Sequence, residues 1–169
     1  FAHATERHLD SRGLSTTFSM DVDGTIYQHY DPQSIRGRHA TWHNVQSDSM
    51  DVAGPFTRSK YAAVGDMKPL DIKMAIGHEN DDKDPLDRKY STIKCWSMTS
   101  QQTAALAAFL PWYLDLRGIP KRACSDWRTF RRGGLGEKDP VTNVTGILAH
   151  TQISGPGQRV DGCMELACI

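Results

Sequence analysis

The sequence contains neither a membrane-spanning apolar run nor a recognisable signal peptide. No apolar run approaches the roughly 20 residues that a bilayer-spanning helix needs, and the N-terminus has neither the basic nor the apolar region of a signal peptide. A mature secreted chain would lack that signal too. We therefore expect no membrane span, and the compartment stays open at this point.

An excess of charge of either sign is also missing. The 169 residues include 20 Lys and Arg and 20 Asp and Glu, so the formal net charge is zero. Proteins that bind nucleic acids or anionic membranes usually carry a broad basic surface. We therefore expect no nucleic-acid partner and a ligand that is recognised locally. The length favours one domain with a single core, and the oligomeric state stays open.

The four cysteines lack the paired CxxC spacing of structural zinc sites. They are Cys95, Cys124, Cys163 and Cys168. Disulfides, for example between Cys95 and Cys124, and free buried thiols both fit an even number of cysteines. The pairing stays open.

A β-hairpin is the clearest local signal that is present. Residues 15–22 alternate and are rich in β-formers, Asp23-Gly24 is typical of a two-residue turn, and residues 25–29 form the return strand. Before the hairpin, residues 6–13 predict about two turns of helix. After it, residues 47–54 predict a strand with Met50 and Val52 on one side and Asp51 on the other.

The clearest helix begins at Thr99, because Gln102 follows three residues later as in a capping box. Gly118 and Pro120 should end it, and Pro111 should kink it. Its apolar face should pack on a sheet. That face consists of Leu106, Phe109, Leu110, Tyr113 and Leu114.

The remaining segments give weaker signals. Strands are predicted at residues 72–76 and 92–96, separated by an acidic loop at 79–87 that lacks the spacing of a helix-loop-helix calcium site. A basic, glycine-rich surface insertion follows at 123–144. The apolar run at residues 147–149 predicts a last buried strand that ends at His150. The turn at 154–157 could then return Arg159 and Asp161 to the same space.

These motifs, in this order, resemble the zinc-dependent N-acetylmuramoyl-L-alanine amidases of the type-2 amidase family, which are related to phage lysozyme-type amidases and peptidoglycan recognition proteins. The segments that carry the resemblance are FAHAT, RGLSTTFSMDVDGTIYQ, RHATWHN, SDSMDVAG, TSQQTAALAAFL and GILAHTQISGPGQRVDG. The resemblance implies an α/β fold with a mixed central sheet flanked by helices. It also implies one catalytic domain over residues 1–169, with a first strand truncated before Phe1 and an insertion around 120–144.

The resemblance also implies a metal site. The family's zinc ligands fall on His3, where the family's first strand ends, on His150 and on Asp161. Arg159 stands where a lysine commonly contacts the scissile carbonyl. Two imidazoles and one carboxylate leave a fourth zinc position for water, which is the catalytic pattern, and such an ion lowers the pKa of water and polarises a carbonyl. Arginine stays protonated, so the role expected for Arg159 is electrostatic.

Further roles follow from the same resemblance. The family's acidic strand residue falls on Asp51, a general base with a shorter side chain than the usual Glu. The substrate-side histidine falls on His39, and Trp42, His43 and Asn44 either contact substrate with it or belong to a plain surface loop. The sequence departs from the family pattern in two places. Thr16 replaces an aromatic residue, and Asp48 interrupts an apolar strand.

The resemblance implies hydrolysis of the amide between N-acetylmuramic acid and L-alanine in peptidoglycan. The expected cofactor is Zn²⁺, and the expected partner is peptidoglycan or a muropeptide. Two other functions stay open: a non-catalytic muropeptide-binding module of the same fold, and an amidase that acts on another peptide. A secreted, periplasmic or phage-associated location is favoured over the cytoplasm.

Overall fold

The structure is a computed structural model that describes residues 2–38, 47–55, 58, 61–76, 89–122 and 146–147. The helices in these ranges are α1 (Ala2–Ser11) and α2 (Ser100–Arg117). The strands are β1 (Phe18–Met20), β2 (Ile26–Gln28), β3 (Met50–Val52), β4 (Pro69–Ile76) and β5 (Lys89–Trp96). The described chain is therefore an α/β structure, as the sequence predicts.

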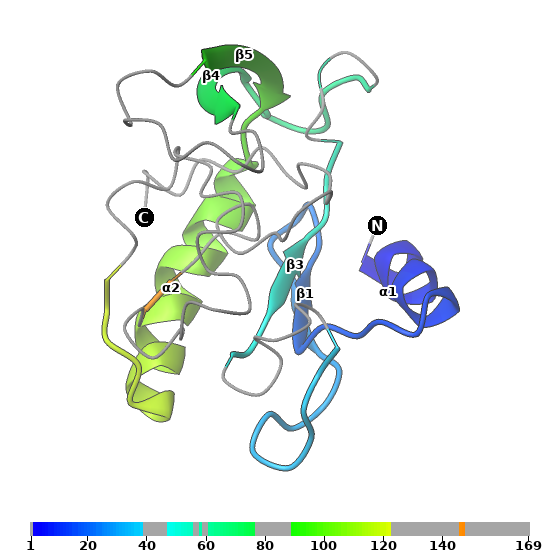
Figure 1. The fold of residues 1–169 in the computed structure, drawn as a ribbon, viewed down its shortest axis with the longest axis vertical. Helices are drawn as coiled ribbons and strands as arrows, with labels where there is room; N and C mark the ends of the chain where they lie inside the picture. The colour runs from blue at the N-terminus through cyan, green and yellow to red at the C-terminus, as the bar shows by residue number, and fades with distance from the viewer. Residues whose placement is uncertain are drawn as a thin grey trace.

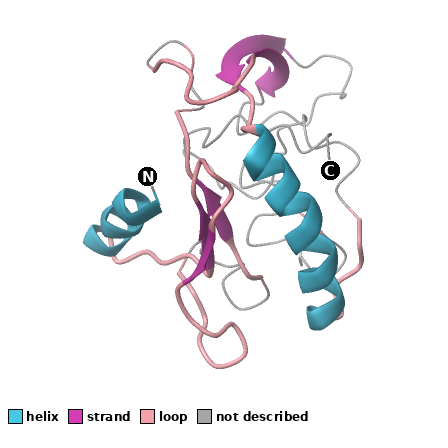
Figure 2. Ribbon diagram, turned by 180° about the vertical axis from the view of Figure 1, so that it is seen from behind, coloured by secondary structure: helices cyan, strands magenta, loops and turns pink. Residues whose placement is uncertain are grey.

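The central sheet is mixed, which confirms the sheet type expected from the sequence. Its order is β2-β1-β3, with β1 antiparallel to β2 and parallel to β3. The sheet lies between the two helices, with α2 on one side and α1 on the other (Figures 1 and 2). Strands β4 and β5 form a separate two-stranded antiparallel sheet, beside the end of α2 at which the helix begins (Figure 1).

The core lies between the central sheet and α2. Met20, Met98 and Leu106 form its buried cluster. The ring of Phe18 lies edge-on to two rings of α2, with centroids 5.0 Å from Phe109 and 4.9 Å from Tyr113. Ile26, Met50 and Val52 pack against the cluster from β2 and β3. The prediction that Met50 and Val52 share one side of their strand is confirmed.

The hairpin is confirmed, but its turn is longer than the two residues expected. The N–H of Asp21 donates to the carbonyl of Thr25 (2.9 Å), and the N–H of Gly24 donates to the carbonyl of Asp21 (3.0 Å), so residues 22–24 form the loop. Gly24 has φ +82°, the left-handed conformation that ends a three-residue hairpin loop. A Cβ at Gly24 would also lie 2.6 Å from the carbonyl oxygen of Gln101 in α2. The turn therefore packs against the helix.

The beginning and the end of α2 match the prediction. Thr99 is the N-cap, and it forms the capping box with Gln102. Gly118 ends the helix at φ +63°, where its N–H donates to the carbonyls of Asp115 and Leu114. Pro111 lies inside the helix, which continues to Arg117.

Gln102 also joins α2 to the sheet. Its side chain is fully buried at 0% exposure. Its amide nitrogen donates to the carbonyl of Ala53 (2.7 Å) after β3 and to the carbonyl of Asp21 (3.2 Å) in the hairpin turn. A buried polar side chain with these partners fixes the helix at one position on the sheet.

Helix α1 begins earlier than the predicted residues 6–13. The segment from Ala2 to Ser11 is rich in helix formers such as Ala, Glu, Arg and Leu and has only one β-branched residue, Thr5. His3 therefore lies in the first turn of a helix, whereas the resemblance placed it at the end of a strand.

The predictions for the remaining segments have different outcomes. The strands predicted at 72–76 and 92–96 are confirmed as parts of β4 and β5. Ile147, expected to begin the last buried strand, donates its N–H to the carbonyl of Arg122 (2.8 Å) just after α2. The acidic loop at 79–87, the insertion at 123–144 and residues 148–150 lie outside the described residues.

Candidate functional site

The face of the central sheet that points away from α2 carries polar side chains. Successive residues of a strand point to opposite faces, so Ser19 points away from the core that Phe18 and Met20 enter. The register pairs Ser19 with Asp51 on β3 and with Tyr27 on β2. Directly paired residues share a face, so a hydroxyl, a carboxylate and a phenol lie on this side.

A chain of polar contacts joins this face to α1. His29 Nε2 lies 2.8 Å from Ser19 Oγ, and His29 Nδ1 lies 3.4 Å from Glu6 Oε1 on α1. The His29 side chain is 17% exposed, and that of Glu6 is 49% exposed. Helix α1 therefore packs on the same face of the sheet as Asp51.

The contacts of Ser19, His29 and Glu6 have the order of a nucleophilic serine, its base and an orienting acid. Ser19 is 1% exposed in the middle of the central strand. A substrate carbonyl cannot reach a hydroxyl in that position. The arrangement is suited to holding α1 against the sheet, and it does not provide an accessible nucleophile.

The structure therefore brings two of the predicted site positions to one side. Asp51 lies on this face, where it is partly buried. His3 lies on α1, one helical turn before Glu6. The structure describes the backbone of His3 and not its side chain.

The other predicted site residues lie outside the described ranges. These are the substrate-contacting residues His39, Trp42, His43 and Asn44, the metal ligands His150 and Asp161, and Arg159. Within the described ranges, no group of three or more His, Cys, Asp and Glu side chains is placed to hold a metal ion. The zinc site formed by His3, His150 and Asp161 therefore stays a prediction.

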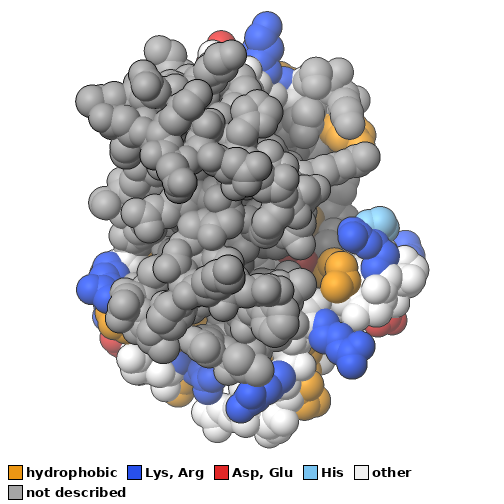
Figure 3. All heavy atoms as spheres, viewed as in Figure 1, with side chains coloured by type: hydrophobic (Ala, Val, Ile, Leu, Met, Phe, Trp, Pro, Cys, Tyr) orange, Lys and Arg blue, Asp and Glu red, His pale blue; other side chains and the backbone are white. Residues whose placement is uncertain are grey.

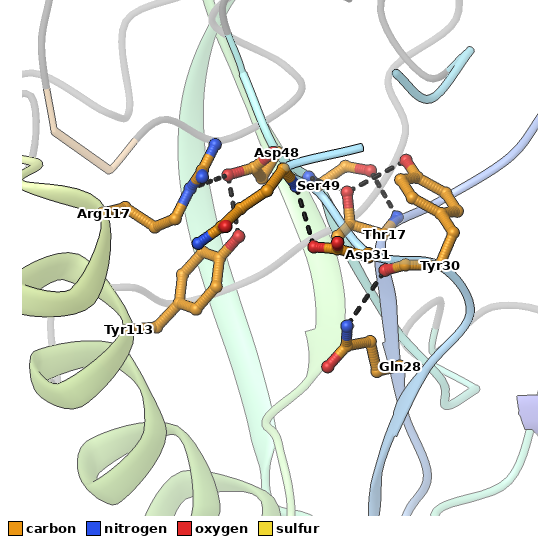
Figure 4. Close-up of polar contacts among 9 residues, drawn as sticks. Thr17, Gln28, Tyr30, Asp31, Asp48, Ser49, Tyr113 and Arg117 are labelled. Carbon is orange, nitrogen blue, oxygen red and sulfur yellow. Dashed lines mark hydrogen bonds and ion pairs between the residues drawn. The ribbon is translucent and has the colours of Figure 1, made fainter. Parts of the chain in front are cut away.

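A second polar cluster surrounds Asp48, where the sequence departs from the family pattern (Figure 4). Asp48 Oδ2 accepts hydrogen bonds from the hydroxyl of Tyr113 (2.7 Å) and from Nε of Arg117 (3.1 Å). Burial raises the pKa of Tyr113 above its ordinary value, and the hydrogen bond to Asp48 raises it further. The phenol is therefore held in its neutral, donating form.

Sequence reasoning missed this cluster. The available signal was the four-residue spacing of Tyr113 and Arg117, which places both side chains on one side of a helix. Thr16, the other departure, is 4% exposed and bonds to Ser49 Oγ (3.0 Å), next to Asp48. Asp48 thus has its partners on α2, and Thr16 has its partner directly before β3.

Cys95 is disulfide-bonded and fully buried, which decides between the two alternatives for this cysteine. Cys124, Cys163 and Cys168 lie outside the described residues.

In the space-filling view, the Lys and Arg side chains that are described lie apart from one another around the rim (Figure 3). On this face, the described residues form no continuous basic patch.

Neither described helix has the length and hydropathy of a segment that crosses a membrane. Comparisons with protein-family models, with curated proteins and with solved structures find no match.

Proposed function

We propose that the protein is a zinc-dependent amidase that hydrolyses the bond between N-acetylmuramic acid and L-alanine in peptidoglycan. One observation carries the proposal beyond the sequence motifs. Helix α1, which contains His3, packs on the face of the central sheet to which Asp51 of strand β3 points, opposite α2. An amidase site of the expected kind requires His3 and Asp51 on one side of the sheet.

The donor set fits a catalytic zinc ion. His3, His150 and Asp161 offer two nitrogen ligands and one oxygen ligand, a combination that zinc accepts while keeping one position open. Bound there, zinc would supply Lewis-acid chemistry towards the amide carbonyl. The residues come from both ends of the chain, so the site would hold the two ends together.

The chain's own residues have separate roles in this proposal. Asp51 removes a proton from the attacking water and delivers it to the nitrogen of the leaving L-alanine. Arg159 remains charged at neutral pH and stabilises the negative charge that develops on the carbonyl oxygen. His39, Trp42, His43 and Asn44 contact the muropeptide.

The disulfide at Cys95 supports a location outside the reducing cytoplasm, because such bonds persist in secreted, periplasmic and surface-exposed proteins. Peptidoglycan is found in those compartments. The proposal therefore favours a chain that meets its substrate in an oxidising environment.

Metal analysis with ligand variants tests the proposal. We expect one zinc ion per chain after purification without chelators, and loss of muropeptide cleavage when the zinc is removed. His3→Ala, His150→Ala and Asp161→Ala should each lower zinc content and cleavage together. The matched control is His8→Ala, an exposed histidine on the same helix as His3. Protein that contains no zinc would contradict the mechanism.

The alternative binding module makes a different prediction. A module of the same fold would retain purified muropeptides without cutting them. Zinc-loaded protein that binds muropeptides and leaves them intact would therefore favour the binding module over the enzyme.

A further inference from the structure

The position of Asp51 depends on the register of a very short strand. Strand β3 contains three residues, Met50–Val52, and it pairs in parallel with β1. A shift of one residue would turn Asp51 towards α2, because strand side chains alternate between faces. Met50 and Val52 would then leave the core cluster that they pack against. The polar contacts that hold β3 in register therefore also set the face to which Asp51 points.

On the β1 side, hydrogen bonds hold Ser49, the residue directly before β3. Ser49 Oγ accepts the N–H of Thr17 (3.2 Å), and the N–H of Ser49 donates to Thr17 Oγ1 (3.1 Å). The carbonyl of Ser49 also accepts the N–H of Phe18 (2.9 Å). These bonds hold the start of β3 to the start of β1.

On the α2 side, Asp48 makes the corresponding contacts (Figure 4). Its Oδ2 accepts from Tyr113 and from Arg117, which lie one turn apart near the end of α2. The carboxylate is 17% exposed and the Arg117 side chain is 27% exposed, so water screens the ion pair less than it screens a surface pair. The ring of Tyr113 also lies against Phe18 of β1. Asp48 is thus tied to a part of α2 that itself touches β1.

The other end of β3 is also bonded to α2. The carbonyl of Ala53, directly after β3, accepts from Gln102 (2.7 Å) in the first turn of the helix. The N–H of Ala53 donates to the carbonyl of Met20 (2.8 Å). Strand β3 is therefore held between two positions of one helix, Gln102 near its beginning and the Tyr113–Arg117 turn near its end.

We infer that Asp48, Tyr113 and Arg117 are positioning residues for the amidase reaction, because they hold β3 in the register that presents Asp51 on the face opposite α2. The inference rests on the proposed function, in which Asp51 transfers the proton. Asp48, Tyr113 and Arg117 do not touch the reacting atoms in this account. They act through the backbone of β3.

Steady-state kinetics and amide exchange of the full chain test the inference. In Asp48→Ala, we expect kcat to fall by about 10-fold to 100-fold, since catalysis is sensitive to displacements of about 1 Å, and KM to change by less than about twofold. Amide exchange at Ala53 should become faster, because its bond to Met20 depends on the register. Asp48→Asn keeps an acceptor for the Tyr113 hydroxyl and should lose less activity than Asp48→Ala.

Two further variants separate positioning from a loss of folding. Tyr113→Phe removes one hydroxyl from the cluster and keeps the ring against Phe18, so it should fold and still lower kcat. The matched control is Asp115→Ala on the same helix, which breaks the exposed ion pair with Lys121 (2.6 Å), beyond the helix end, and should leave kcat unchanged. All variants are assayed well below their melting temperatures.

The outcomes distinguish this inference from the proposed function. Unchanged kcat in Asp48→Ala and Tyr113→Phe, with an active wild type and a lower melting temperature, would overturn the positioning role alone. A wild-type protein that cleaves no muropeptide would overturn the proposed function and the positioning role with it. Reduced kcat and faster exchange at Ala53, both absent from Asp115→Ala, are the results that the inference requires.

Discussion

The two faces of the central sheet carry side chains of different kinds, although the same three strands form both. Towards α2, Phe18 and Met20 of β1 meet apolar groups. Towards α1, Ser19 bonds to His29 and lies in register with Asp51. Apolar burial on one face supplies stability without directional chemistry, whereas polar groups on the other face offer proton transfer and hydrogen bonding. A substitution of an apolar side chain on the first face should therefore affect stability, and a substitution of Asp51 on the second face should affect activity.

The largest expected effect is on activity and comes from the polar face. Asp51→Asn should lower kcat by about 10²-fold to 10⁴-fold, the contribution typical of a general base, because the amide cannot take a proton from water. Its melting temperature should stay near that of the wild type. Muropeptide cleavage rates and thermal unfolding check both results. Asp10→Asn, an exposed carboxylate on α1, is the control. Equal activity in the two variants would remove Asp51 from the mechanism.

The apolar face should respond in the opposite way. Met20 is 0% exposed, and Met20→Ala should lower the free energy of unfolding by about 2–5 kcal/mol through lost burial and a cavity. Urea unfolding measures the change, and Ile35→Ala, at a position 53% exposed, should cost less than about 0.5 kcal/mol. The kcat of the folded Met20→Ala fraction should stay near the wild-type value. A large loss of kcat without a loss of stability would contradict the division between faces.

Substitution of Gln102 measures how much a buried polar side chain on the apolar side of the sheet contributes to stability. Gln102→Glu keeps the acceptor for the capping box but removes the donor to the carbonyls of Ala53 and Asp21. We expect a loss of about 1–3 kcal/mol in unfolding free energy, since the buried carbonyl of Ala53 loses its side-chain donor, while the carbonyl of Asp21 keeps its bond from Gly24. Gln101→Glu, one residue earlier and exposed, is the matched control. Chemical denaturation of both variants would show equal stability if the buried amide contributed nothing.

The smallest expected effect concerns pH. The pKa of Tyr113 is raised in the folded protein, first by burial and then by the hydrogen bond to Asp48. Its contribution to stability is complete below the ordinary pKa of about 10 and declines as pH rises above it, because the unfolded tyrosine ionises first. Tyr113→Phe should therefore lose stability less steeply than the wild type above pH 10. Equal slopes in unfolding experiments at several pH values would contradict this origin.

Local signals in the sequence predict a large part of the described fold. The capping box at Thr99 and the αL glycine at Gly118 act within one helical turn, and both helix ends are where the sequence places them. The turn of the hairpin is one residue longer than expected. Its last residue, Gly24, also lies close to Gln101, a tertiary contact that the dipeptide Asp23-Gly24 does not encode.

The candidate site is predicted less completely, because its contacts join residues that are far apart in the chain. Asp51 lies opposite α2 as the alternation of its strand predicts. Asp48 is separated from Tyr113 and Arg117 by 65 and 69 residues, and the four-residue spacing of those two does not indicate which residue they bind. The positions of His150, Arg159 and Asp161 stay predictions from the resemblance.

Mass spectrometry of a muropeptide digest tests the proposed amidase activity. The wild-type protein with zinc should release a peptide with a free N-terminal L-alanine and leave the sugar with an intact lactyl group. Chelation and Asp51→Asn should abolish or strongly reduce these products. Intact muropeptide, or cleavage at a different bond, would contradict the assignment as an N-acetylmuramoyl-L-alanine amidase.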